Sequence, residues 1–426
     1  MTALTASDLK RNQNLLLFYF LYTTLHGALR KWVFAGVSGV NDLLFLVQLI
    51  SPFLVVVLMK REKTLFSYQP LVPLALVLIA LALNPMNATV FHGIFGFILH
   101  FGFWLLMITF LYERDAFPVE NLIKIMIVIC LAESILTFIQ FSLPSSHLLN
   151  RYESSDDVVG FDDEGGVRVI GTFSYIAGYG SLLFFTGLFI WALMVEAKKY
   201  IPIILALVGM SLVSAFMNGS RSIMLPLVLC IGFGFISYGT FAHKIKLIGV
   251  IMMLFVAGVI FGVGKQGAVV ERAYTGFAYR VTSGQKSGEA QSRTMGTFVE
   301  AFDFNGKYPL FGIGLGATYQ GATNKWGRSP ELVEYGYTEE EPERVVVEGG
   351  YFLLLIRIGL FTFLATQLRI PWIFSAPILF YIFFFTLFVF NAYQTAYVFF
   401  GLALLDKVYG AKKEQQKTHE YDENYS

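Results

Sequence analysis

Long runs of apolar residues constrain this chain more than any other feature of its sequence. The runs are roughly 17 to 25 residues long, the length of helix that crosses about 30 Å of hydrocarbon. Only 14% of the 426 residues are charged, whereas soluble domains have about 25%. We therefore expect an all-α integral membrane protein with about twelve transmembrane helices. The predicted spans lie near residues 13–29, 40–59, 70–84, 89–112, 119–142, 169–195, 200–217, 222–242, 245–263, 348–367, 370–388 and 390–406.

The positions of lysine and arginine predict the orientation, because short basic loops stay in the cytoplasm. With a cytoplasmic N-terminus, nearly every short basic segment falls inside, and so does the basic tail after residue 406. The exception is Arg30 with Lys31, which lies outside beside Trp32. We favour an interfacial anchor for this pair, with a place in the functional site as the alternative. Both termini are expected to be cytoplasmic.

The spans and loops divide the chain into four parts. Residues 1–263 hold the first nine helices, 264–347 form a large extracytoplasmic loop, 348–406 hold helices ten to twelve, and 407–426 form a cytoplasmic tail. Loops of that length are usually functional or disordered. Recurring aromatic residues, and a segment at 297–305 with the pattern of an amphipathic helix, argue against disorder.

Arginines in the outer parts of the chain are candidate phosphate ligands. Arg280 and Arg293 lie in the large loop, and Arg221 lies at the outer end of the eighth span. A guanidinium binds phosphate oxygens bidentately and keeps its charge when partly desolvated. A solvated loop surface remains the alternative for the loop arginines, and extension to the membrane interface remains the alternative for Arg221.

Three glycines and one glutamate form a second candidate group. Gly312, Gly314 and Gly316 would let backbone N–H groups approach an anion or a sugar, although a flexible turn remains the alternative. Glu348 lies at the outer boundary of the membrane, where a partly buried carboxylate suits general-base chemistry.

Two ionisable residues lie deeper in the predicted spans. Arg357 follows Glu348 by about nine residues, and Glu133 lies within the fifth span. Ionisable residues at this depth usually face the protein interior and pair with one another. We therefore expect Arg357 and Glu133 to form a structural ion pair.

Several classes of function lack support in the sequence. The basic residues form no nucleic-acid-binding stripe, so we expect no nucleic-acid partner. The cysteines, Cys130 and Cys230, lie inside apolar runs, and the histidines show no metal-site spacing. No nucleotide-binding motif occurs. We therefore expect neither a metal nor a cofactor.

Three short segments, in this order, carry a family resemblance. They are Gly219–Ser222, then Arg293 followed by Pro309–Gly316, and finally Glu348–Tyr351 with Arg357 and Gly359. Together with the large outer loop, they resemble the O-antigen ligase and polymerase superfamily of bacterial envelope polysaccharide assembly. The chain departs from the family in one place: ligases commonly have His-Asn before the tyrosine of the third segment, and this chain has Glu348-Gly-Gly.

The resemblance implies a GT-C-like, metal-independent, inverting glycosyltransferase of the bacterial plasma (inner) membrane. Its substrate would be an undecaprenyl-pyrophosphate-linked glycan, with a chain-length regulator and a flippase of the same pathway as possible partners. By similarity, Arg221, Arg280 and Arg293 would bind the pyrophosphate, with Arg280, Arg293 and Glu348 catalytic. The departure at Glu348 favours an O-antigen or exopolysaccharide polymerase. The alternatives are a ligase that transfers glycan to lipid A or protein, and a lipid-glycan flippase or other secondary transporter.

Overall fold

Helices make up most of the part of the chain that the structure describes. This computed structural model describes residues 4–152, 162–163, 166–196, 201–239, 244, 265–286, 297–303, 307–335 and 341–425. Within these ranges the single sheet is a two-stranded hairpin of β1 (Asp162–Asp163) and β2 (Gly166–Val167). The prediction of an all-α protein is therefore confirmed.

The predicted spans correspond closely to helices. The span predicted at 245–263 lies outside the described residues, and each of the others contains a helix. Six of the described helices, α2, α4, α5, α6, α7 and α15, are long and apolar enough to cross a membrane. The helices at the predicted spans are α1 (Ala6–Ala28), α2 (Ser38–Leu58), α3 (Leu71–Ala82), α4 (Val90–Tyr112), α5 (Val119–Ser142), α6 (Ile176–Glu196), α7 (Ile201–Asn218), α8 (Arg221–Ser237), α15 (Glu341–Gln367), α16 (Trp372–Phe385) and α17 (Ala392–Tyr425).

The segment predicted to be the large outer loop contains helices in its described residues. The amphipathic helix expected at 297–305 is present as α12, which ends at Phe302. The fourfold division of the chain into membrane parts, loop and tail stays a prediction. The helices of this segment are α10 (Lys265–Lys286), α12 (Thr297–Phe302), α13 (Gln320–Trp326), α14 (Pro330–Tyr335) and the beginning of α15.

The chain forms two compact units, and we describe each by itself. Unit 1 consists of Met1–Thr23, Leu43–Pro118 and Ser287–Phe399. Unit 2 consists of Thr24–Asp42, Val119–Lys286 and Phe400–Ser426. Each unit therefore combines segments that are far apart in the sequence.

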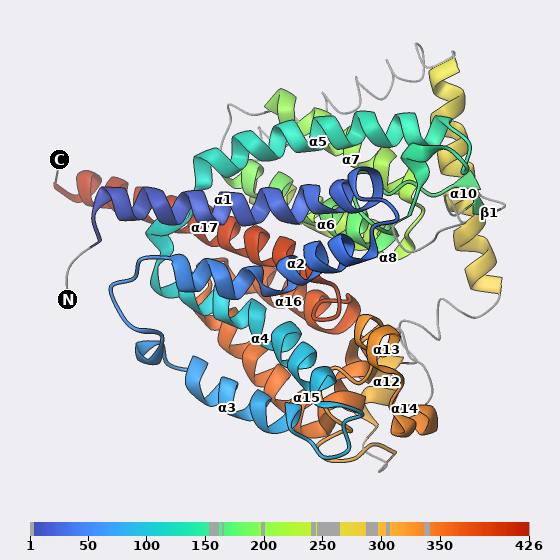
Figure 1. Ribbon diagram of the computed structural model, residues 1–426. Coiled ribbons are helices and arrows are strands. Elements are labelled where there is room, and N and C mark those ends of the chain that lie inside the picture. The colour runs from blue at the N-terminus through green and yellow to red at the C-terminus, as the bar shows by residue number, and fades with distance from the viewer. Residues whose placement is uncertain are drawn as a thin grey trace. The chain divides into compact units, whose positions relative to one another are not determined.

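In unit 1, α3 packs on α4, α15 packs on α16, and the short helices α12 and α13 pack on α15 and α4 (Figure 1). An aromatic cluster joins α4 to the end of α16. The ring of Phe103 lies 4.6 Å from that of Phe388, and the ring of Trp104 lies 5.7 Å from that of Phe383. All four side chains are buried, so they fix the elements that carry the site described below.

In unit 2, α6 packs on α8 and α7, while α5 and α10 pack on α7 (Figure 1). Glycines lie where α6 meets α8. A Cβ at Gly187 would lie 3.1 Å from Cys230 Cβ, and one at Gly234 would lie 2.9 Å from Trp191 Cα. Small residues let membrane helices approach closely, and this approach replaces the hydrophobic driving force that lipid removes.

Helix α15 is broken at Gly350, whose φ of 64° and ψ of −171° are not helical. Glu341 and Arg357 are sixteen residues apart, which in a continuous helix is about 24 Å. Their side chains nevertheless form an ion pair of 2.6 Å. The two halves of α15 therefore fold toward each other at Gly350. We call Glu341–Gly349 the buried half-helix, because all of its residues are buried. The span expected at 348–367 is thus interrupted near its start.

Candidate functional site

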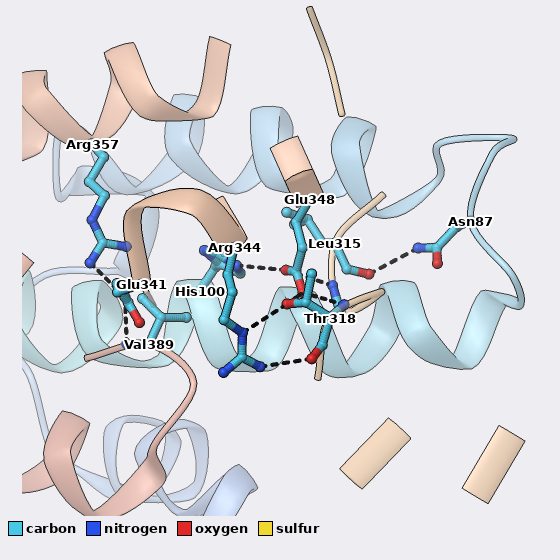
Figure 2. A network of polar contacts seen from close by, with 10 residues as sticks. Asn87, His100, Leu315, Thr318, Glu341, Arg344, Glu348, Arg357 and Val389 are labelled. Atoms are coloured by element: carbon cyan, nitrogen blue, oxygen red, sulfur yellow. Dashed lines mark hydrogen bonds and ion pairs between the residues drawn. The ribbon is translucent and has the colours of Figure 1, made fainter. Parts of the chain in front are cut away.

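Glu348 is the centre of a buried polar network in unit 1 (Figure 2). Its Oε1 accepts hydrogen bonds from Thr318 N (2.9 Å) and Thr318 Oγ1 (2.6 Å). Its Oε2 accepts one from Gly316 N (2.8 Å) and lies 3.1 Å from His100 Nε2. The side chain is 0% exposed. A buried carboxylate is tolerated only when donors surround it, and here four protein groups do so.

The glycine-rich loop brings those donors to Glu348. Gly312, Gly314 and Gly316 have φ values of 65°, 113° and 81°, a backbone conformation that residues with a side chain rarely adopt. Gly314 N donates to the Glu348 carbonyl (2.9 Å), and Ile313 N donates to the Val347 carbonyl (2.9 Å). The loop therefore caps the C-terminal end of the buried half-helix. Of the three glycines, Gly316 donates its N–H to an anion, which is the Glu348 carboxylate of the same chain.

Two asparagines between α3 and α4 hold the same loop from the other side. Asn84 Nδ2 donates to the Gly312 carbonyl (2.9 Å). Figure 2 shows the second contact, in which Asn87 Nδ2 donates to the Leu315 carbonyl (2.9 Å). Sequence reasoning missed both residues, because asparagine is common in turns and no motif distinguishes these two.

Arg344 completes the network around Thr318. Its Nε donates to Thr318 Oγ1 (3.1 Å), and its Nη2 donates to the Thr318 carbonyl (2.8 Å). Its guanidinium also lies 3.9 Å from the centre of the Phe390 ring. Sequence reasoning missed Arg344, although Glu341, Arg344 and Glu348 repeat at the spacing of one helix face. That spacing was the available signal.

Arg357 forms its ion pair with Glu341 instead of the predicted partner. Arg357 Nη2 lies 2.6 Å from Glu341 Oε1, and its Nε donates to the Phe383 carbonyl (3.0 Å). Val389 N also donates to Glu341 Oε1 (2.9 Å). The expectation of a structural ion pair at Arg357 is confirmed, but the choice of Glu133 as its partner is wrong. The observed pair joins the two halves of α15.

A cleft in unit 1 lies beside these two networks. Apolar side chains of α3, α4, α15 and α16 form most of its wall, and His100 and Arg357 also line it. Each of these two side chains is bound to a carboxylate, His100 to Glu348 and Arg357 to Glu341 (Figure 2). The cleft therefore combines an apolar wall with an imidazole and a guanidinium, each held in place by a carboxylate.

The predicted arginines Arg221 and Arg280 come together in unit 2. Arg221 is the first residue of α8, and its Nη1 donates to the Arg280 carbonyl (3.3 Å). Arg280 belongs to α10, and its Nη2 donates to the Gly166 carbonyl (2.7 Å). A Cβ at Gly219 would lie 2.7 Å from Arg280 Nη1, so the guanidinium covers this glycine. We call Arg221 and Arg280 the arginine pair. Arg293 lies outside the described residues.

Lys31 is buried in unit 2, so the interpretation as an interfacial anchor is wrong. An anchor extends from the protein surface to the headgroups, but Lys31 is 1% exposed. Its Nζ donates to the Gly171 carbonyl and lies 4.3 Å from the Trp32 ring. Burial lowers the pKa of the Lys31 ammonium to about 7, although the Glu133 carboxylate opposes this shift. Glu133 itself accepts a hydrogen bond from Thr172 N (3.1 Å), the residue next to Gly171.

Comparison of the chain with protein-family models, curated proteins and solved structures gives no match. In the described ranges, no three or more histidine, cysteine, aspartate or glutamate side chains gather in an arrangement suited to a metal ion. The functional argument therefore rests on the arginine pair of unit 2 and the Glu348 network of unit 1.

Proposed function

We propose that the chain is a membrane glycosyltransferase that polymerises undecaprenyl-pyrophosphate-linked oligosaccharide repeats. The observation that carries this proposal is the arginine pair at the N-terminus of α8. Arg221 and Arg280 are separated by 59 residues in the sequence, yet one hydrogen bond joins them. The Arg280 guanidinium covers Gly219, two residues before Arg221, so both arginines lie at the N-terminus of α8.

The position of the pair suits a pyrophosphate. The first N–H groups of a helix have no partner within the helix, and the helix dipole is positive at this end. The N-cap residue of α8, Ser220, makes no side-chain cap hydrogen bond. Two guanidinium groups at such an end favour phosphate oxygens. They stabilise the negative charge that develops on a departing pyrophosphate, and the proposed inverting reaction then needs no metal.

The finer organisation belongs to the same proposal. It consists of about twelve spans in a GT-C-like arrangement, with the large loop between the ninth and tenth outside the bacterial plasma membrane and both termini in the cytoplasm. The partners are the lipid-linked glycan and the bilayer, with a chain-length regulator and a flippase of the same pathway.

Removing either arginine of the pair is expected to abolish long polymer. We predict that Arg221→Ala and Arg280→Ala each lower the yield of high-molecular-weight glycan on the order of 100-fold or more, because charge stabilisation on the leaving group is lost. Gel analysis of glycan from cells with equal amounts of inserted protein measures this. Arg221→Lys and Arg280→Lys should retain part of the yield, because lysine keeps the positive charge but lacks the planar set of hydrogen-bond donors of a guanidinium.

Arg328→Ala is the matched control, since Arg328 is an exposed arginine of the same predicted outer loop. It should leave yield and length unchanged. The role proposed for Arg293 is tested by Arg293→Ala in the same assay. Unchanged polymer in the Arg221, Arg280 and Arg293 variants would remove the basis of the proposal.

The same gels separate polymerisation from ligation. When a polymerase is lost, single repeat units remain on the acceptor, whereas the loss of a ligase leaves lipid A or the acceptor protein unmodified. The departure at Glu348-Gly-Gly favours the polymerase, and a gel with unmodified acceptor would assign the ligase instead.

A lipid-glycan flippase is the second candidate, and one observation favours it. Transporters place broken helices and ionisable groups at their binding sites. In unit 1 the break of α15 at Gly350 and the non-helical segment 386–391 are joined by Glu341, which binds both Arg357 and Val389. Protein in liposomes with lipid-linked glycan on one side distinguishes the two. Glycan movement without new glycosidic bonds would assign transport.

A further inference from the structure

A group of basic side chains lies in unit 1, where α1 begins and α2 ends. We propose that this group, together with the exposed ring of Phe66, binds the headgroup of an anionic phospholipid. The proposal goes beyond the glycosyltransferase activity and does not rest on it. We call the group the basic cluster, and its members are Lys10, Arg11, Lys60 and Lys63.

Hydrogen bonds hold the two segments of the basic cluster together. The side chain of Asn12 is fully buried, and its Nδ2 donates to the Lys60 carbonyl (2.8 Å) while its Oδ1 accepts from Lys60 N (2.9 Å). Arg11 Nη2 donates to the carbonyl of Leu58 (3.1 Å), the last residue of α2. Basic residues from two distant parts of the sequence are therefore neighbours on a fixed backbone.

The positive charge of the basic cluster is available to a ligand. Its three lysines are exposed, and none of them forms an ion pair with a described residue. The two carboxylates of the same segments bind N-terminal groups instead. Asp8 Oδ2 accepts hydrogen bonds from Thr5 N (3.2 Å) and Thr5 Oγ1 (2.7 Å), and Glu62 Oε1 accepts one from Leu4 N (3.4 Å). Because residues 8–11 and 60–63 contain five basic and two acidic side chains, the net charge is positive.

The exposed apolar face of α2 leads directly to the basic cluster. This helix is long and apolar enough to cross a membrane, and the exposed side chains near its end include Leu54, Val57 and Leu58. The helix ends at Leu58, and exposed charge begins two residues later at Lys60. The boundary between hydrocarbon and headgroups is therefore expected here, because lysines extend to the headgroup level. A lipid whose acyl chain contacts Val57 has its own phosphate beside the basic cluster.

Phe66 adds an apolar contact at the same boundary. It is 84% exposed and belongs to a single 3-10 turn, Leu65–Ser67, that follows Lys63. The next residue, Tyr68, is fully buried and donates its hydroxyl hydrogen to Glu113 (2.8 Å), so the turn has a fixed anchor. An exposed aromatic ring beside lysines is typical of surfaces that lie at the membrane interface.

The continuity of these two surfaces identifies the occupant. Acyl chains suit the apolar face of α2, and a negative headgroup suits the lysines. A zwitterionic headgroup carries its own cation, which the lysines repel. An acidic protein in the aqueous phase would contact the lysines and leave the apolar face of α2 uncovered. An anionic phospholipid satisfies both surfaces.

Native mass spectrometry of the full chain in detergent tests this binding. The chain is titrated with phosphatidylglycerol or with phosphatidylcholine of the same acyl chains, and we expect tighter binding of phosphatidylglycerol. The triple variant Lys10→Gln, Lys60→Gln, Lys63→Gln is expected to weaken phosphatidylglycerol binding on the order of tenfold or more, because each lysine near a membrane surface contributes roughly fivefold. Phosphatidylcholine binding should not change. Phe66→Ser should weaken the binding of phosphatidylglycerol several-fold.

The matched control removes the same charge from another part of the chain. Lys412→Gln, Lys413→Gln and Lys417→Gln together change α17 near its C-terminal end and should leave phosphatidylglycerol binding native. Native binding in the Lys10, Lys60 and Lys63 variant would overturn the proposal. So would an equal loss in the two triple variants, which would assign the preference to net charge, and so would equal affinity of the native chain for the two lipids.

Photocrosslinking locates the site on the native chain, so it does not depend on the folding of any variant. A photoactivatable phosphatidylglycerol in vesicles that contain the protein should label peptides from residues 4–12 or 57–66. Excess phosphatidylglycerol should displace this labelling, and excess phosphatidylcholine should not. Labelling only in other peptides would overturn the site. Neither measurement uses polymer yield, so its outcome is independent of the proposed function.

Discussion

Arg357→Leu is expected to lower the free energy of unfolding by about 3 to 5 kcal/mol, because it leaves Glu341 as a buried charge without its cation. The side chains of this pair are 6% and 1% exposed, so water does not replace the lost partner. The substitution also removes the link between the two halves of α15. Thermal or denaturant unfolding of purified protein in detergent measures the effect.

The double variant Glu341→Gln with Arg357→Leu is the control for this interpretation. It removes both charges, so neither side chain is left as an isolated buried ion. We expect it to be less destabilised than the sum of the two single variants, with a coupling of about 0.5 to 3 kcal/mol. Additive effects would show that the pair contributes no interaction of its own.

Gly316→Ala is expected to destabilise the Glu348 network by about 2 to 5 kcal/mol. The first part of the cost is the left-handed backbone of Gly316, with φ of 81°, which is unfavourable for alanine. The second part is steric, because the new Cβ would lie 2.1 Å from the His92 carbonyl oxygen and 2.9 Å from Gly96 N. Unfolding in detergent measures the total.

Gly327→Ala separates these two costs. Gly327 has a similar φ of 87°, but a Cβ there meets nothing within 4 Å. It should therefore show only the backbone cost, about 1 to 2 kcal/mol. Equal destabilisation by the two substitutions would contradict the close approach of the glycine-rich loop to α4.

The helices were predictable from the sequence because each apolar run must satisfy its own backbone in lipid, which leaves an α-helix as the solution. The interruption of α15 was not predictable in the same way. Hydropathy follows the composition of a window, and the break depends on a single residue, Gly350, with positive φ. Because Val345–Val347 just before Gly350 are apolar, the mean hydropathy of a window there does not reveal that the helix changes direction.

The candidate site was only partly predictable for a related reason. Residue type and spacing located Glu348 and the three glycines, since glycine and carboxylate have few roles in such a segment. Their roles depend on partners that are distant in sequence, such as His100, 248 residues before Glu348. No local pattern marks His100. The sequence therefore predicted a partly buried base at the membrane boundary, where the structure has a fully buried and hydrogen-bonded carboxylate.

The contacts of the glycine-rich loop also set the order in which unit 1 is completed during synthesis. Asn84 and Asn87 bind carbonyl groups of Gly312 and Leu315, about 228 residues further along the chain. Domains emerge from the ribosome N-terminal part first. His100 therefore enters the membrane long before Glu348 exists, and a chain truncated ahead of the buried half-helix retains these polar groups without their native partners. The native hydrogen bonds of Asn87 and His100 can therefore form only when the last quarter of the protein has been made.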